Sequence, residues 1–144
     1  MNPSTLRLYL MRLVFLLNFL WLGFYAWPRL INHTGPWDPV RGVAFSFWAA
    51  LSTLSLVGIR SPLKMVPLLL LQLVYKSIWL MAVYLPMRGA LSTGLTPVMA
   101  GGVIVDLLVI PWSYVLAAYV KAPGDGWRRN AGVEAPPRVS ESRI

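Results

Sequence analysis

Two ionisable side chains of opposite sign lie inside long apolar stretches of the sequence. Lys76 stands near the middle of PLLLLQLVYKSIWLMAVYLP, residues 67–86, and Asp106 stands within residues 96–120. A lone charge at the centre of a bilayer costs at least about 2.5 kcal/mol on insertion scales. Each residue is therefore expected to have a partner or a function. A lysine and an aspartate in this setting form an ion pair, relay a proton or hold a polar ligand.

The two charges are predicted to lie at the same depth. Lys76 is about 16 Å from the end of its stretch, and Asp106 is about 15 Å from the start of the next, at 1.5 Å per residue. Helices joined by a short connection pack as antiparallel neighbours, so we predict a Lys76–Asp106 ion pair. Gln72 lies one turn before Lys76 on the same helical face. Together with Asn18 from the first apolar stretch, it completes the predicted intramembrane polar cluster.

The sequence leaves three uses open for this pair. As a structural clamp, it fixes the order and register of the helices. As a relay, it passes a proton or a substrate through a small transporter, which requires Asp106 to titrate. It also suits an anionic or polar ligand, or a charge supplied by another subunit. Further polar candidates for the cluster are Tyr75, Ser52, Thr53 and Ser55.

The composition is that of a polytopic membrane protein. Of the 144 residues, 57% are hydrophobic and only 12% are charged, which is about half the charged fraction of soluble domains. We attribute the formal net charge of +8 to the positive-inside rule, which places Lys and Arg on the cytoplasmic side of a membrane protein. The sequence has no basic face with interleaved aromatic residues, so we expect no nucleic-acid binding. We expect the lipid bilayer to be the first partner, and the cytoplasmic (inner) membrane to be the location.

Catalytic and cofactor signatures are missing from the sequence. There are no cysteines, which excludes iron–sulfur clusters and thiolate zinc sites. His33 is the single histidine, and Asp106 is the single acidic residue within an apolar stretch. No pair of carboxylates and no Ser–His or Cys–His couple is predicted to converge. We therefore expect no enzyme activity, no catalytic residues, no metal and no cofactor.

Four segments are long and apolar enough to span a bilayer, which requires about 20 residues each. We predict an all-α, antiparallel four-transmembrane-helix bundle within residues 1–121, with a kink at Pro111 in its fourth helix. Residues 122–144 are rich in Pro, Gly and charge and predict a disordered cytoplasmic tail. The four helices are expected at about 6–27, 40–59, 63–87 and 96–120.

Lysine and arginine residues are distributed unevenly about these segments. Arg29, Arg41 and Arg88 lie on one side, Lys76 lies within the third segment, and the other nine of the 13 lie on the side of both termini. This asymmetry predicts that the N and C termini are cytoplasmic. Aromatic and basic residues near the segment ends are predicted membrane-interface anchors. These anchors are Trp27, Trp37, Trp127, Arg128 and Arg129.

A faint internal repeat relates the two halves of the chain. Tyr25 matches Tyr84 and Gly35 matches Gly94 at a constant offset, where an outgoing helix turns into a returning one. This is the pattern of two pseudo-repeated helical hairpins.

Two stretches of the sequence, in the third and fourth apolar segments, resemble known proteins. LVYKSIWLMAVYLP, followed after a loop by GGVIVDLLVIPWSYV, resembles a group of small, uncharacterised four-helix bacterial inner-membrane proteins. The resemblance covers the third and fourth segments. It implies the fold but no activity.

The function expected from the sequence is that of a non-enzymatic integral membrane protein. It would be an accessory, assembly or scaffold subunit of a larger membrane complex, with the Lys76–Asp106 pair as a structural clamp. The alternative is a small proton-coupled transporter or channel that uses the pair as a relay and works as a homodimer. Polar groups that face one lumen would favour transport. Gly42, Ser46 and Ala50 recur every four residues in the second segment and predict close helix packing in a bundle. A stripe of small residues that faces lipid would instead favour docking.

Overall fold

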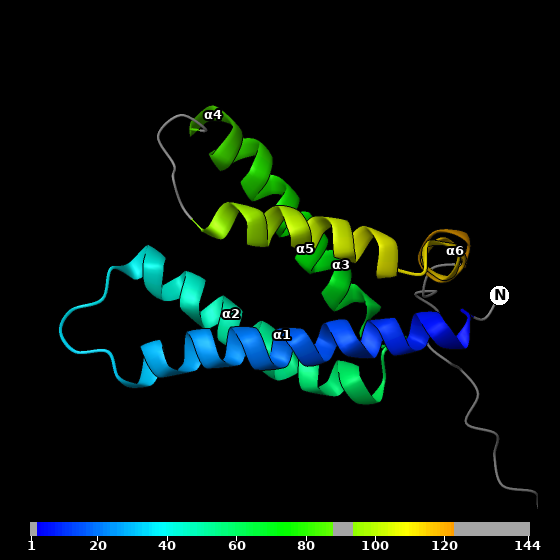
Figure 1. The fold of residues 1–144 in the computed structure, drawn as a ribbon, viewed down its shortest axis with the longest axis horizontal. Coiled ribbons are helices and arrows are strands. Elements are labelled where there is room, and N and C mark those ends of the chain that lie inside the picture. The colour runs from blue at the N-terminus through cyan, green and yellow to red at the C-terminus, as the bar shows by residue number, and fades with distance from the viewer. Residues whose placement is uncertain (1–2, 88–93, 123–144) are drawn as a thin grey trace, which may run out of the picture.

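The computed structural model describes residues 3–87 and 94–122, and every regular element in these two ranges is helical (Figure 1). Three helices are long and apolar enough to cross a membrane, and a bent pair of shorter helices makes a fourth span if it is counted as one. The predicted all-α membrane fold is therefore confirmed at the level of three to four spanning helices. The predicted tail lies outside the described residues apart from Ala122.

Helices α1 (Thr5–Ile31) and α2 (Pro39–Arg60) form the first hairpin. Asp38 starts α2, because its carboxylate accepts a hydrogen bond from the Arg41 N–H at 2.7 Å. Pro39 follows at the first helical position, where its missing N–H leaves no helical bond unmade. The two helices pack against each other more extensively than any other pair of described elements.

The first helix is longer than predicted. The expected segment ends at Trp27, ahead of Pro28, but α1 continues to Ile31. Asn32 then ends it, donating its N–H to the Pro28 carbonyl at 3.0 Å. A proline removes its own N–H and therefore one helical hydrogen bond. Because that loss falls close to the end of a long helix, it does not stop the helix.

The second hairpin begins with helix α3 (Val66–Trp79), which continues through a π-helical turn, η1 (Leu80–Tyr84), into α4 (Leu85–Met87). Together they form one span of 22 residues, about 33 Å long at 1.5 Å per residue. This span starts later than the predicted residue 63, because residues 62–65 form a turn. Helix α5 (Leu95–Val109) packs against α3 and completes the hairpin.

The predicted fourth segment, 96–120, is not one straight helix. After α5, the chain resumes as a short helix, α6 (Trp112–Val115), and a π-helical turn, η2 (Leu116–Lys121). The two parts are bent by 70°. With 15 residues, α5 is about 22 Å long, which is shorter than the hydrocarbon core of about 30 Å.

The break lies at Pro111, where a kink was predicted. Ile110 adopts an extended conformation with ψ of 125°, because a residue that precedes proline is excluded from the helical region. Pro111 has no N–H to donate to the carbonyl of Leu107. The indole Nε1–H of Trp112 donates to that carbonyl instead, at 2.9 Å. The side chain after the proline thus replaces the lost backbone bond and stabilises the bend.

The described helices are packed together more tightly at one end of the molecule than at the other. The N-terminal end of α1, the α2–α3 connection and α6 lie at one end, and the 32–38 loop and the start of α5 lie at the other (Figure 1). The larger buried cluster joins α1, α2, α3 and the α5–α6 break around the fully buried Phe15 and Ile110. The smaller buried cluster comes from α1 and α2 alone and consists of Ala26, Phe45 and Ala49.

The close packing of α1 on α2 generates a stability prediction. A Cβ added at the buried Gly58 would lie 2.5 Å from the enclosed ring of Phe15. Gly58→Ala is therefore expected to lower the free energy of unfolding by about 1–3 kcal/mol through overpacking, measured as a lower unfolding midpoint in detergent.

The matched control is Gly101→Ala in α5, where a Cβ meets nothing within 4 Å. This variant is expected to keep or slightly raise the unfolding midpoint, since alanine favours helix over glycine. Equal midpoints for the two variants would contradict the α1–α2 contact.

Candidate functional site

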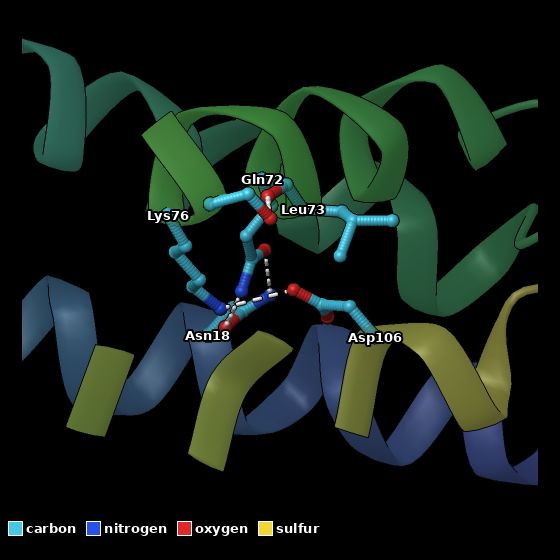
Figure 2. A network of polar contacts seen from close by, with 6 residues as sticks. Asn18, Gln72, Leu73, Lys76 and Asp106 are labelled. Carbon is cyan, nitrogen blue, oxygen red and sulfur yellow. Dashed lines mark hydrogen bonds and ion pairs between the residues drawn. The ribbon is translucent and has the colours of Figure 1, made fainter. Parts of the chain in front are cut away.

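The predicted ion pair is present in the interior of the bundle. The Nζ of Lys76 on α3 lies 3.1 Å from Oδ2 of Asp106 on α5, and the two side chains are 9% and 1% exposed. The two helices are neighbours, so the residues meet at the depth that their positions in the sequence predict. Figure 2 shows the pair between α3 and α5, with α1 passing alongside.

Two amide side chains lie next to the ion pair. Asn18 Nδ2 on α1 donates to Gln72 Oε1 on α3 at 2.6 Å, and Gln72 Nε2 donates back to Asn18 Oδ1 at 3.1 Å. Gln72 is one turn from Lys76, so the amide pair and the ion pair lie side by side (Figure 2). The structure thus brings the four predicted cluster residues together, from three helices that belong to both hairpins.

A glycine makes room for the lysine. A Cβ added at Gly102, one turn before Asp106, would lie 2.5 Å from Lys76 Nζ and 2.9 Å from Cε. The lysine side chain therefore lies directly over the α5 backbone at Gly102 and reaches the carboxylate along it. Gly102 lies four residues before Asp106 in the sequence, but its role depends on the path of the lysine side chain, which only the structure shows.

The ion pair keeps hydrogen-bonding capacity that the described residues do not use. Asp106 Oδ1 is buried and has no partner among them. Lys76 makes one side-chain hydrogen bond within the described part of the chain, although an ammonium group has three N–H donors. A buried polar atom without a partner is costly, so this capacity marks the pair as a place where a ligand or water would bind.

A cavity of about 530 Å³ lies beside the polar cluster, between the two hairpins. The cluster forms its polar part, and the rest of the lining is apolar or aromatic. Along α5 it extends from Gly94 to Asp106, about 18 Å of helix. It therefore connects one end of the bundle with the ion pair. Its aromatic walls are Trp21, Tyr25, Trp48 and Tyr75.

The cavity also has an exposed side between α1 and α5. Leu17 and Trp21 on α1 line it and are 55% and 66% exposed on the surface of the bundle. Val98 and Val105 on α5 line it as well and are 46% and 42% exposed. Since α1 and α5 make few contacts, the cavity opens sideways between them, towards the surroundings of the bundle.

The other polar candidates serve different contacts. Thr53 and Ser55 donate to the carbonyls one turn earlier in α2 at 2.9 and 2.7 Å, and Ser52 donates to the Phe19 carbonyl of α1 at 2.9 Å. None of these three hydroxyls joins the Lys76 cluster. A hydroxyl that bonds the preceding turn of its own helix is common in membrane helices. The sequence does not show whether a given hydroxyl bonds its own helix or a side chain of another helix. Tyr75 lines the cavity.

The predicted interface anchors are only partly described. Trp27 is exposed on the last turns of α1. Trp37 is half-buried and stacks on His33, with ring centroids 3.6 Å apart. Trp37 therefore packs on the loop end of the first hairpin. The remaining anchors, Trp127, Arg128 and Arg129, lie outside the described residues.

The burial of the ion pair predicts a strong asymmetry between single and double substitutions. Lys76→Met leaves Asp106 buried without its partner and is expected to cost about 3–5 kcal/mol of unfolding free energy. The double variant Lys76→Met, Asp106→Leu removes both buried charges and is expected to recover much of that loss. Denaturant titration in mixed micelles measures both changes.

Lys64→Met serves as the control, because Lys64 is exposed and its loss is expected to leave the unfolding free energy unchanged. A double variant as unstable as Lys76→Met alone would show that the pair is not the buried contact described.

The comparisons with protein-family models, with curated proteins and with solved structures found no match to this chain. The resemblance to small four-helix bacterial inner-membrane proteins therefore stays a prediction.

Proposed function

We propose that the protein is a small, non-enzymatic transporter of the cytoplasmic membrane that uses Lys76 and Asp106 as its transport site. The observation that carries this proposal is the cavity, which leads from one end of the bundle to a buried ion pair with unused hydrogen-bonding capacity. An apolar cavity with a few convergent polar groups has the composition of a ligand site. Ionisable residues within a membrane mark transport pathways in many proteins. A structural clamp alone requires no cavity.

The break in the fourth segment supports the same proposal. Transporters hold their substrates near the bilayer midplane, where discontinuous helices meet. Helix α5 is interrupted little more than one turn after Asp106, and the larger buried cluster closes the bundle at that end. The cavity extends towards the opposite end as far as Gly94, so movement at Pro111 would change which end of the bundle the cavity reaches.

The pair provides a means of proton coupling. While Lys76 holds Asp106, their charges cancel. A ligand that draws the ammonium group away leaves the carboxylate without its counter-charge, and the carboxylate is then more easily protonated. In this scheme a ligand and a proton enter the site together, and no net charge is moved to the middle of the membrane.

We also propose that both termini are cytoplasmic and that the two helical hairpins are related by an internal repeat. Cytoplasmic N and C termini are supported by the nine-to-three distribution of Lys and Arg about the apolar segments. Two related hairpins are supported by the sequence matches at the two outer turns, where Tyr84 and Gly94 are described and the intervening residues 88–93 are not. The proposed path lies within one chain, so it does not require the homodimer.

An accessory, assembly or scaffold subunit, with the ion pair as a clamp, is the second candidate. The observation in its favour is on α2, where Ser46 and Ala50 are exposed and Gly42 is half-buried. Such small residues let a neighbouring membrane helix approach closely. The native mass of the protein, extracted from its own host's membranes in mild detergent, separates the two candidates. A stoichiometric larger complex would favour the subunit, and a lone monomer or symmetric dimer would favour the transporter.

The transport proposal predicts proton movement that depends on the pair. Full-length protein is reconstituted into vesicles of phosphatidylcholine and phosphatidylglycerol that contain a pH-sensitive dye, and a pH gradient is imposed. The wild-type protein is expected to dissipate the gradient faster than protein-free vesicles. Lys76→Met and Asp106→Asn are expected to slow dissipation by about tenfold or more, since each loses a charge-assisted hydrogen bond at the site.

Lys64→Met is the matched control, because it removes an exposed lysine and is expected to keep the wild-type rate. Equal rates for the wild-type protein, Lys76→Met and protein-free vesicles would exclude the relay.

A further inference from the structure

We propose that the cavity is a path for the anionic headgroup of a membrane lipid, which moves along α5 to Lys76 while its acyl chains stay in the bilayer. This inference rests on the proposed transport function and names the substrate class of the same site. It follows from the shape of the cavity, its sideways opening and the charges along it.

The length and size of the cavity fit a headgroup rather than a whole lipid. The lining of α5 runs from Gly94, at the end of the bundle, to Asp106, about 18 Å and hence about half of the bilayer thickness. The volume of about 530 Å³ lies in the range of cavities that enclose a small molecule. The lipid chains must then remain outside the protein.

The sideways opening gives the chains that place. Trp21 on α1 and Val98 on α5 line the cavity and are also exposed on the apolar outer surface of the bundle. A headgroup between these helices is therefore shielded from hydrocarbon, while chains attached to it pass outward between α1 and α5. A soluble ligand would need no such opening towards lipid.

The charges along the cavity fit an anion. Arg29 lies over the ring of Tyr25, with its guanidinium carbon 3.8 Å from the ring centroid. Tyr25 lines the cavity, whereas Arg29 itself lines a second pocket on α1. Lys76 lies at the inner end. An anionic phosphate in the cavity thus meets the Lys76 ammonium group at mid-depth, and Arg29 lies behind the ring of Tyr25 in its wall. Lys76 and the amide groups of Asn18 and Gln72 provide spare N–H donors for phosphate oxygens.

The charge balance allows one monovalent headgroup at a time. The Lys76 ammonium group leaves the Asp106 carboxylate and pairs with the phosphodiester, and Asp106 takes up one proton that enters from the aqueous phase together with the headgroup. One anion and one proton have then entered, so the site stays neutral. The other titratable groups that line the cavity among the described residues are Tyr25 of α1 and Tyr75 of α3, and α2 contributes Trp48.

The test follows lipid movement between leaflets. Full-length protein is reconstituted into vesicles that contain phosphatidylglycerol labelled with nitrobenzoxadiazole on an acyl chain, and the outer-leaflet label is reduced with dithionite. A parallel set of vesicles carries labelled phosphatidylcholine, which has no net charge. Wild-type protein is expected to bring inner-leaflet phosphatidylglycerol to the outer leaflet about tenfold faster than phosphatidylcholine. Both lipids carry a phosphodiester, but the choline cation of phosphatidylcholine would bring an uncompensated positive charge into the site beside Lys76.

Two exposed positions on α5 provide matched variants. Val98→Trp fills the sideways opening without touching the ion pair and is expected to slow phosphatidylglycerol movement about tenfold. Leu108→Trp adds the same side chain at a position that is 70% exposed and does not line the cavity, and it is expected to keep the wild-type rate. Lys76→Met is expected to abolish the preference for the anionic lipid.

The outcomes separate this inference from the proposed function. Rates that are equal for the two lipids, or equal for Val98→Trp and the wild-type protein, would overturn the headgroup path. If proton movement still depends on Lys76 in that case, the transport function stands and its substrate is not a lipid. If neither lipid nor protons move faster than in protein-free vesicles, both proposals fail.

Discussion

The contact between Lys76 and Asp106 is the constraint on which the rest of the bundle depends. Neither charge is stable alone in a membrane interior, so α3 and α5 must lie next to each other with the two residues at one depth. Their 3.1 Å contact sets the register of the second hairpin. The reciprocal amide bonds between Asn18 and Gln72 then tie α1 to α3. Four polar side chains thereby join helices from both hairpins where the hydrophobic effect provides no drive for association.

This arrangement also accounts for the cavity. Beyond the polar cluster, towards the break at Pro111, buried side chains from four helices fill the space. On the other side of the cluster, the smaller buried group comes from α1 and α2 alone, and α5 makes few contacts with α1. The ion pair therefore lies at the boundary between a packed half and an open half of the bundle. That position is what favours transport over a purely structural role.

The depth of the charges could be predicted from the sequence because it depends only on helical rise and on short connections, and the predicted pair is present. The position of the bend could be predicted from Pro111, but its size could not. Its 70° angle depends on the extended Ile110 and on the Trp112 indole, which takes over the Leu107 carbonyl. The role of Gly102 and the sideways opening arise from the relative placement of helices, which no local pattern encodes. The hydroxyls of Thr53 and Ser55 bond their own helix, a choice that composition cannot decide.

Solid-state NMR in lipid bilayers can measure the distance between the Lys76 side-chain nitrogen and the Asp106 carboxylate carbon, and so test whether the buried ion pair forms in a membrane. Replacing Lys64 and Lys121 by arginine leaves Lys76 as the single lysine of the chain, so one ¹⁵N-labelled amino acid reports on it alone. We expect a strong dipolar coupling, consistent with the 3.1 Å contact between Nζ and Oδ2. A separation beyond about 6 Å, at which a direct ion pair no longer exists, would contradict this expectation.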